Sequence, residues 1–354
     1  MTTIILEVNL KKIKENFNKL KKISSSSKTA AVVKSNAYGL GINKIAKLLI
    51  KQGCRDFYVA TLEEALELRE INKQVNIYVL NGIRKNEIFL FIKNKIIPVI
   101  NNLYEYRIVK KINKKISINL HYDTGMNRLG MNYDEMKAIS QDKKNYKIRI
   151  NNIISHLASA EIQKNKFNNI QLNKFLKIKT IYKNTNLSIC NSAGIMLSKR
   201  FHLDMVRPGI SIYGGYGNKK ARKIIKNVIK LKAQIIQIKK IYKNYTIGYN
   251  QTFISKKIMY IGTVGIGYAD GMPRCFSNTG FGYYNRKKLN IVGRISMDTL
   301  TIDITKYYKS IKIGDYVEFI NNSFDVEKFA KKSKTVSQDV LTSFGTRVKI
   351  KYIN

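Results

Sequence analysis

The residue most suggestive of chemistry is a lysine at the end of an apolar run. Residues 31–41 read Ala-Val-Val-Lys-Ser-Asn-Ala-Tyr-Gly-Leu-Gly, which predicts a short strand ending at Lys34 and then a turn. A charged amine is costly to bury, so a lysine here is either functional or reaches solvent along its aliphatic stem. Active sites of barrel folds lie at the carboxyl ends of the strands, where Lys34 falls. Lys34 is therefore the first candidate for function.

The elements around Lys34 alternate regularly over the first two-thirds of the chain. Short β-branched runs are each followed by a polar or glycine-containing turn and a helical segment. The clearest helix covers residues 61–70, with Thr61 as N-cap and Glu64 as its capping-box partner. The runs predicted as strands are 30–33, 57–60, 76–80, 97–100, 116–120, 153–155, 187–189 and 205–212. These units predict a (β/α)8 barrel of the TIM type, and a doubly wound open sheet is the alternative.

The pattern changes after about residue 225. From there the chain reads as short strands separated by turns such as Gly314-Asp315. The runs are 233–241, 259–265, 289–295, 300–304, 316–320 and 346–352. We expect a barrel domain over residues 1–225 and a mostly β domain over residues 226–354, with the first few residues as candidates to join the β domain.

Composition narrows the class of protein. The chain has 354 residues, of which 44% are hydrophobic and 10% aromatic, so wholesale disorder is excluded. No apolar run approaches the roughly 20 residues of a membrane span, and the first residues lack the basic leader of a secretory signal. Cys54, Cys190 and Cys275 fit neither a zinc site nor a disulfide framework. We expect a cytoplasmic protein with no metal and no membrane partner.

The net charge of +42 suggests nucleic-acid binding at first sight. The basic residues are dispersed, however, and Lys, Asn, Ile and Tyr are over-used together. Each of these four can be encoded by A and T alone, so an AT-rich genome would produce the same composition without a binding surface. No RNA-binding sheet motif or zinc-finger spacing accompanies the charge, and no specific nucleic-acid partner is expected.

A set of short motifs resembles the alanine racemase family, whose members use pyridoxal 5'-phosphate. The segment Val-Lys-Ser-Asn-Ala-Tyr-Gly around Lys34 resembles the family's cofactor-attachment motif. The other matching segments follow in the family's order along almost the whole chain: 123–130, 155–158, 190–193, 206–210, 248–249, 265–271 and 292–298. Collinear matches of this number favour one family over chance.

The resemblance implies a reaction shared between two bases. Lys34 would hold the cofactor through its amine and act on one face of the substrate's Cα, and Tyr249 would act on the opposite face. A tyrosine has an ordinary pKa of about 10, so cationic neighbours must favour its ionised form, and His156 and Arg207 match the family's supporting pair. Arg207 would also face the pyridine nitrogen and, being always protonated, suppress transamination.

The resemblance also implies the remaining contacts and the assembly. Two hydroxyls and two backbone N–H groups would bind the cofactor phosphate, those of Tyr38, Ser192, Gly209 and Ile210. The whole cofactor-binding set is Lys34, Tyr38, His156, Asn191, Ser192, Arg207, Gly209 and Ile210. Arg128 would bind the substrate carboxylate, and Tyr268 would line the substrate entrance. Met297 would reach the substrate from the second subunit of a homodimer with shared active sites.

Three features depart from the family's pattern. His121 stands where many members have a lysine that becomes carbamylated. A neutral imidazole could accept a hydrogen bond from Arg128 but supplies no anion, so a lower substrate affinity is expected. Thr346 replaces a tyrosine that touches the phosphate, Leu40 replaces a histidine, and the N-terminal stretch reads Val8-Asn9-Leu10. None of these changes removes a proposed catalytic group.

The function expected from the resemblance is interconversion of L-alanine and D-alanine, supplying D-alanine for peptidoglycan. Three alternatives stay open: a racemase of broader range acting on serine or a larger amino acid, a non-catalytic pyridoxal-phosphate carrier, and a basic nucleic-acid-binding protein. Carriers of that kind have only the barrel, so the matches at Tyr249 and Met297 argue against one. A racemisation assay with a panel of amino acids would separate the enzymatic readings.

Overall fold

The computed structural model describes residues 3–112, 114–142 and 147–354. The chain divides into two compact units. The larger comprises Ile13–Lys226, and the smaller comprises Met1–Lys12 together with Asn227–Asn354. The larger unit is therefore a continuous insert between the two pieces of the smaller one.

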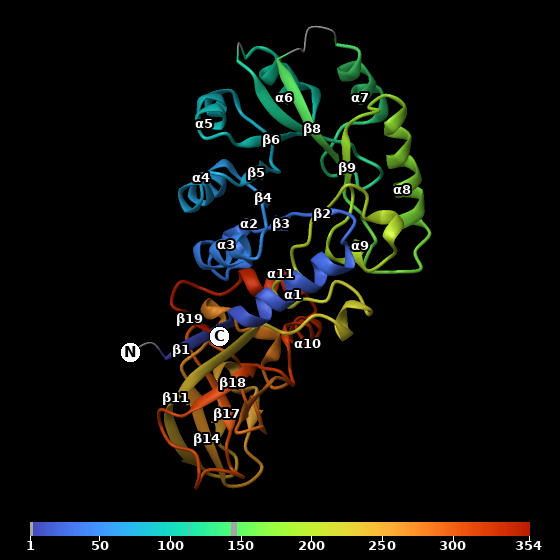
Figure 1. Ribbon diagram of the computed structural model, residues 1–354. Helices are drawn as coiled ribbons and strands as arrows, with labels where there is room; N and C mark the ends of the chain where they lie inside the picture. Colours follow the sequence, from blue (N-terminus) through green and yellow to red (C-terminus); the bar gives the residue numbers. More distant parts are fainter. Residues whose placement is uncertain (1–2, 113, 143–146) are drawn as a thin grey trace. The chain divides into compact units, whose positions relative to one another are not determined.

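Parallel strands build the larger unit (Figure 1). A seven-stranded sheet pairs them in chain order: β3 (Ala31–Val32), β4 (Asp56–Val59), β5 (Asn76–Val79), β6 (Ile97–Ile100), β7 (Ile116–His121), β8 (Ile148–Ile154) and β9 (Asn186–Ser188). The next strand, β10 (Met205–Val206), pairs in parallel with β2 (Lys28–Thr29), just before β3. On its other side, the N–H of Arg207 donates to the carbonyl of Cys190 beyond β9 at 2.9 Å. Bonds on both sides of β10 connect the two edges, which confirms the barrel over the open sheet.

Several of the helices that follow the strands begin directly after a polar capping residue. The helices α4, α6 and α7 begin after Thr61, Asn102 and Asn132, whose side chains accept the backbone N–H three residues on. The helices of this part of the chain are α1 (Leu10–Ile23), α2 (Lys34–Tyr38), α3 (Ile42–Lys51), α4 (Leu62–Ile71), α5 (Ile88–Lys93), α6 (Leu103–Lys110), α7 (Tyr133–Ser140), α8 (Phe167–Leu176) and α9 (Ser192–Ile195). The predicted helix over 61–70 is confirmed as α4, but the Glu64 carboxylate accepts from Ala60 rather than from Thr61.

The last predicted strand of the barrel, 205–212, is shorter in the structure. It ends at Val206, and Pro208, having no N–H, cannot donate to a continuing ladder. The chain then turns tightly, since the N–H of Ile212 donates to Gly209 at 2.8 Å. This turn leaves Gly209 at the barrel's carboxyl end.

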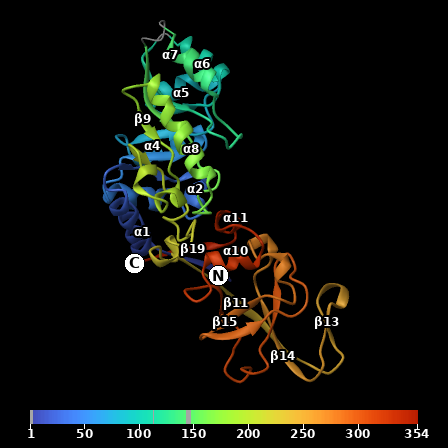
Figure 2. The ribbon, with the colours of Figure 1, turned by 90° about the vertical axis from the view of Figure 1, so that its right-hand side faces the viewer.

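The smaller unit is built on an eight-stranded, largely antiparallel sheet (Figure 2). Its strands are β1 (Ile4–Asn9), β11 (Ile229–Ile241), β14 (Met259–Val264), β15 (Phe281–Tyr284), β16 (Lys287–Asn290), β17 (Leu300–Asp303), β18 (Tyr316–Ile320) and β19 (Lys349–Ile353). The long strand β11 pairs with β1, β14 and β18. Because alternate residues of β1 are buried, the N-terminal strand belongs to this sheet's core. A separate hairpin joins β12 (Thr246–Ile247) to β13 (Phe253–Ile254).

The predicted strands of this unit each overlap an observed one, and other elements were missed. No predicted element corresponds to β12, β13, β15 or the helices α10 (Val326–Lys332) and α11 (Ser337–Thr342). The two helices contain 7 and 6 residues, too few for a helical period to stand out.

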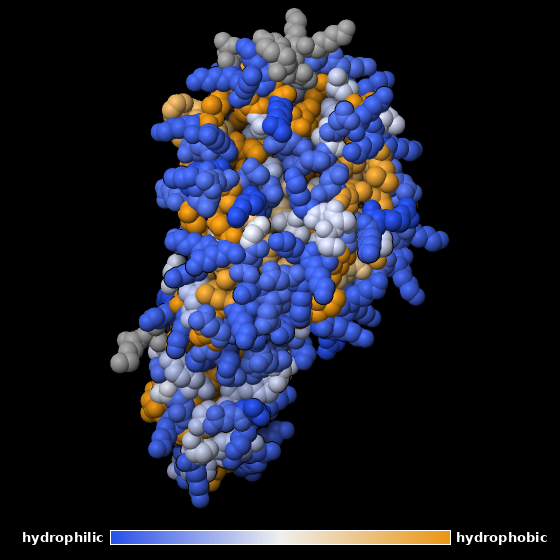
Figure 3. All heavy atoms as spheres, in the orientation of Figure 1, coloured by the Kyte–Doolittle hydropathy of each residue, from blue (hydrophilic) through white to orange (hydrophobic). Residues whose placement is uncertain are grey.

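Basic residues lie on the exposed side of the first helix. On α1 the apolar residues Ile13, Phe17 and Leu20 are buried, whereas Lys14 and Lys21 are exposed. Hydrophilic side chains are scattered over the whole face shown in Figure 3, with apolar patches between them. Within the described ranges, none of the helices has the length and apolar character that crossing a bilayer requires.

Candidate functional site

Lys34 follows β3 after one residue, Val33, and the backbone beyond Lys34 is left-handed. Residues 35–38 have φ between 52° and 57°, so α2 is a single left-handed turn. Each such residue costs about 1–2 kcal/mol when it is not glycine. The side chain of Asn36 helps to hold the turn by accepting the N–H of Ile42 at 2.8 Å. The turn carries Lys34 at its start and Tyr38 at its end.

Charged groups act on the Lys34 amine. Burial, and next the positive charge of Arg128, lower the pKa of Lys34, while the carboxylate of Glu64 acts in the opposite direction. A lowered pKa increases the neutral, nucleophilic fraction of an amine at neutral pH. The structure therefore places a lysine suited to covalent chemistry at the predicted end of the barrel.

Ser192 and the turn after β10 form a polar cradle. The Ser192 hydroxyl is buried and accepts the N–H groups of Gly209 at 2.9 Å and Ser211 at 3.2 Å. The N–H of Gly209, predicted to bind a phosphate directly, thus already has a protein acceptor, and the hydroxyl proton of Ser192 is left to donate. Ile210 follows as a buried residue of the same turn.

Tyr38 completes this cradle. Its ring stacks on Tyr213 with centroids 4.6 Å apart, and burial raises the pKa of Tyr38 far above the ordinary value, so the phenol stays protonated and can donate. A Cβ added to Gly209 would lie 2.4 Å from the Tyr38 hydroxyl. Only glycine therefore fits at position 209.

Arg207 is a buried cation inside the barrel. It is 5% exposed, and its guanidinium donates to the carbonyl of Ser188 at 2.8 Å and to the carbonyl of Ser155. It also lies over the ring of Tyr58 at 5.7 Å. Burial lowers the pKa of Arg207, but the ordinary value is so high that the group stays charged. The barrel therefore contains a permanent positive charge.

His156 is neutral in this site. Asn191 accepts the N–H of Gly194 through its carbonyl oxygen, so its amide NH2 faces Nε2 of His156 at 3.4 Å. Burial, followed by the charges of Arg207 and Arg128, lowers the pKa of His156 to about 3. Of the two residues expected to be cations, His156 is therefore neutral and Arg207 is charged.

His121, at the end of β7, has one fixed tautomer. The amide NH2 of Asn101 donates to the carbonyls of Leu80 at 3.0 Å and Val99 at 3.1 Å, so its oxygen accepts from Nδ1 of His121 at 2.8 Å. Burial, with the charges of Arg207 and Arg128, lowers the pKa of His121 to about 4. Nε2 is therefore a neutral acceptor, and the imidazole itself offers no negative charge to the exposed Arg128.

The remaining predicted residues belong to the smaller unit. Tyr249, Met297 and Tyr268 are 67%, 53% and 44% exposed. The backbone carbonyl of Met297 accepts the N–H of Ala269, which fastens the Met297 loop to the segment of Tyr268. The other predicted site residues therefore all belong to the barrel unit, and these three are exposed on the smaller unit.

Three residues important for this geometry escaped the sequence analysis. Glu64 was read only as a helix cap, and Asn101 was not singled out. Arg347 was also missed: its guanidinium pairs with Asp270 at 2.9 Å and Asp298 at 2.6 Å, within the loops of Tyr268 and Met297. The two aspartates lay inside matched motifs, but their shared arginine is distant in sequence.

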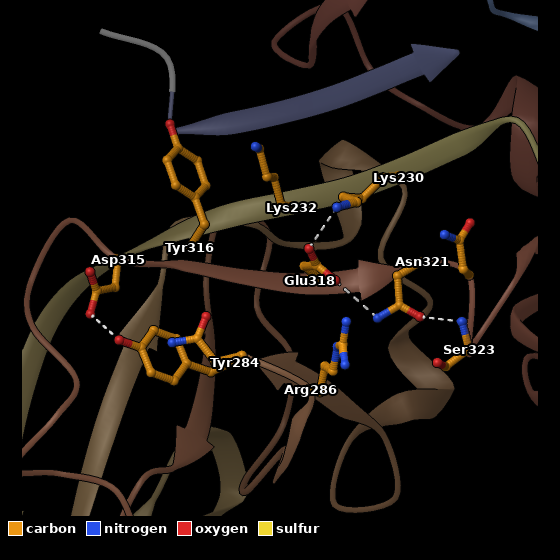
Figure 4. A pocket seen from close by; sticks show the side chains of 11 residues that line it. Lys230, Lys232, Tyr284, Arg286, Asp315, Tyr316, Glu318, Asn321 and Ser323 are labelled. Atoms are coloured by element: carbon orange, nitrogen blue, oxygen red, sulfur yellow. Dashed lines mark hydrogen bonds and ion pairs between the residues drawn. The ribbon is translucent and has the colours of Figure 1, made fainter. Parts of the chain in front are cut away.

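A cavity of about 640 Å³ opens elsewhere on the smaller unit (Figure 4). Two pairs of its lining residues interact: Lys230 with Glu318 at 3.0 Å, and the Tyr284 hydroxyl with Asp315 at 3.0 Å. None of the predicted site residues lines it. The cavity is a polar surface hollow rather than a candidate active site.

Comparisons with known proteins agree with the geometry. Residues 8–217 match the family described as "Alanine racemase, N-terminal domain", and residues 228–352 match "Alanine racemase, C-terminal domain". The chain is 39% identical to an alanine racemase of Rickettsia africae, with 100% of both chains covered. It resembles the crystal structure of alanine racemase from Bartonella henselae with covalently bound pyridoxal phosphate, with a TM-score of 0.95, 36% identity and full coverage of both chains. It likewise resembles the biosynthetic alanine racemase from Pseudomonas aeruginosa, with a TM-score of 0.93, 28% identity and full coverage of both chains. The chain belongs to the alanine racemase family.

Proposed function

We propose that this chain interconverts L-alanine and D-alanine with pyridoxal 5'-phosphate attached to Lys34. The observation that carries the proposal is the placement of Lys34, an amine of lowered pKa at the carboxyl end of β3 and within electrostatic reach of Arg128. An amine nucleophile beside a guanidinium suits a substrate with one amino and one carboxylate group. When bound, the cofactor supplies a ring that makes the substrate's Cα proton acidic.

The residues around Lys34 fit a phosphorylated ring. Both hydroxyls lie beside Gly209: Ser192 accepts its N–H at 2.9 Å, and the Tyr38 hydroxyl lies 2.4 Å from the place of an added Cβ. Hydroxyl and N–H donors in such a place suit a phosphate. We assign the phosphate to the hydroxyls of Tyr38 and Ser192 and to the turn of Gly209 and Ile210, in which Ser192 holds the Gly209 N–H and Ile210 offers its own. We assign the ring to His156, Asn191 and Arg207.

Two groups would exchange the proton at Cα. Lys34, with its amine freed when the substrate's amino group takes its place, would take or return the proton on one face, and Tyr249 would do so on the opposite face. The permanent charge of Arg207 would disfavour protonation of the ring of a bound cofactor. Arg128 and the backbone N–H of Met297 bind the substrate carboxylate, and the neutral Nε2 of His121 orients Arg128.

The reaction takes place in a homodimer with shared sites. Tyr249 and Met297 are exposed on the smaller unit, whereas Lys34 and Arg128 belong to the barrel. Other large apolar side chains are also exposed near the β12–β13 hairpin, namely Tyr242, Tyr245, Ile254 and Ile258. Such exposure supports an interface. In a two-fold dimer each smaller unit would cover its partner's barrel, giving two equivalent mixed sites.

Two variants test both assignments. Lys34→Ala should lose the absorption band of the attached cofactor and the activity, and an unchanged band would refute the attachment site. For the dimer, Lys34→Ala and Tyr249→Phe are co-refolded and assayed. Random pairing restores about a quarter of wild-type activity, because half of the dimers have one intact site. Activity no higher than that of the unmixed variants, with subunit exchange demonstrated, would refute the shared site.

In the cell, the product D-alanine would be used for peptidoglycan. Cys54, Cys190 and Cys275 are all free thiols, which supports a reducing compartment such as the cytoplasm. Racemisation rates with L-alanine, L-serine and larger amino acids define the substrate range. A rate with serine equal to that with alanine would replace the alanine-specific assignment.

A further inference from the structure

Glu64, in the first turn of α4, holds two backbone N–H groups with one carboxylate. Oε1 accepts the N–H of Ser35 at 2.5 Å, and Oε2 accepts the N–H of Ala60 at 2.7 Å. Its own N–H donates to the N-cap hydroxyl of Thr61. The carboxylate therefore ties the residue directly after Lys34 to the end of β4 and to α4.

The segment that Glu64 ties is conformationally costly. Residues 35–38 are four consecutive non-glycine residues with positive φ, a conformation that L-residues rarely adopt in succession. Ser35 is exposed, and its N–H has Glu64 as its acceptor in the part of the chain that the structure describes. A strained turn of this kind persists only where its surroundings hold it. Glu64 provides such a hold at the first residue of the turn.

Glu64 also acts on Lys34 through its charge. The charged neighbours Arg128 and Glu64 act on the pKa of Lys34 in opposite directions, Arg128 lowering it and Glu64 raising it. Lys34 in turn helps to lower the pKa of the neutral His156. The carboxylate is therefore close enough to the amine for its removal to be measurable in the titration of Lys34.

We propose that Glu64 is a positioning residue for Lys34: it holds the left-handed turn in the conformation that directs Lys34 and Tyr38 toward one cofactor. The inference rests on the proposed function, in which these two residues bind pyridoxal phosphate. Without Glu64 only a fraction of molecules would have the turn formed, and the apparent affinity falls by that fraction.

The test compares Glu64→Gln with Glu63→Gln in the full chain, with and without cofactor. Glu63 is an exposed acid in the same helical turn. Its variant removes one negative charge and leaves the two hydrogen bonds of Glu64 in place. Three quantities are measured: the dissociation constant for pyridoxal phosphate, the pH dependence of its attachment rate, and amide exchange in the peptide 34–39. The unfolding temperature is recorded in parallel.

For Glu64→Gln we expect the dissociation constant to rise about tenfold to a hundredfold, as the loss of a charge-assisted hydrogen bond allows. Attachment needs the neutral amine, so its half-maximal rate should move to lower pH once the negative charge is gone. Exchange in peptide 34–39 should accelerate. Glu63→Gln should stay within about twofold of the wild type, because it breaks neither bond.

Identical behaviour of the two variants would overturn the proposal, as would weaker binding with unchanged exchange and an unchanged pH profile. If Glu64→Gln does not fold, Glu64→Gln combined with Ser35→Gly should recover most of the affinity, because glycine adopts a left-handed conformation at little cost. In the wild type, exchange of the Ser35 amide at the rate of an unbonded loop would also refute the role of Glu64. A cofactor band that survives in Lys34→Ala would refute the attachment site alone, since the exchange measurement does not depend on it.

Discussion

The neutral state of His121 makes the protein's stability depend on pH in a way that can be calculated. Burial and the charges of Arg207 and Arg128 hold the imidazole neutral, and Asn101, which accepts from Nδ1, fixes its tautomer. Replacing His121 by Gln removes the titration and keeps a side-chain carbonyl as an acceptor. The variant should therefore lose less stability on acidification than the wild type does.

The magnitude follows from the two pKa values. The pKa of His121 is lowered from 6.5 to about 4 on folding. Between these values the unfolded chain binds the proton more readily, so the stabilisation is present above pH 6.5 and is lost as the pH falls toward 4. From pH 7 to pH 5 the free energy of unfolding should fall by about 2 kcal/mol through His121. His156, with a pKa of about 3, should remove about 2 kcal/mol more over the same interval.

Urea-induced unfolding of the cofactor-free protein at pH 5, 7 and 8 measures these differences. The wild type should lose about 4 kcal/mol between pH 7 and pH 5 through the two histidines, and His121→Gln about 2 kcal/mol. Between pH 7 and pH 8 the two proteins should change equally, because a neutral imidazole is then the main form in both states. An equal loss in wild type and variant between pH 7 and pH 5 would show that His121 is not held neutral in the folded protein.

Three further predictions concern the reaction. Tyr249→Phe should slow exchange of the L-alanine Cα proton about 10²–10⁴-fold more than that of D-alanine, and equal losses in proton exchange would reject the assignment of faces. Gly209→Ala places a Cβ 2.4 Å from the Tyr38 hydroxyl, an overpacking cost of about 1–3 kcal/mol, so pyridoxal phosphate should bind about tenfold more weakly or worse in a fluorescence titration. His121→Lys should lower the KM for alanine in bicarbonate buffer, because carbamylation of the new lysine would place an anion beside Arg128. A KM of this variant that does not depend on bicarbonate would show that Nε2 of the imidazole already suffices to orient Arg128.

The sequence by itself determined the elements that depend on local pattern. The apolar runs between capping residues predicted the strands of the barrel in their correct order, because burial of a parallel strand leaves a continuous apolar signature. The helix after Thr61 followed from its capping residue. Lys34 was singled out because it ends an apolar strand, and Arg207 because its short motif resembles one of the alanine racemase family.

Only the tertiary structure decided what depends on residues distant in the chain. The N-terminal strand β1 pairs with β11 and β19, which no local pattern specifies. The charge state of His121 depends on burial and on Arg207 and Arg128, and its tautomer depends on Asn101, so both became visible only in the folded protein. The left-handed turn at 35–38 likewise depends on Glu64, from the next βα unit. Secondary-structure propensity reflects the conformation that a residue favours by itself. Backbone strain and side-chain pKa depend instead on the neighbours that the fold brings together.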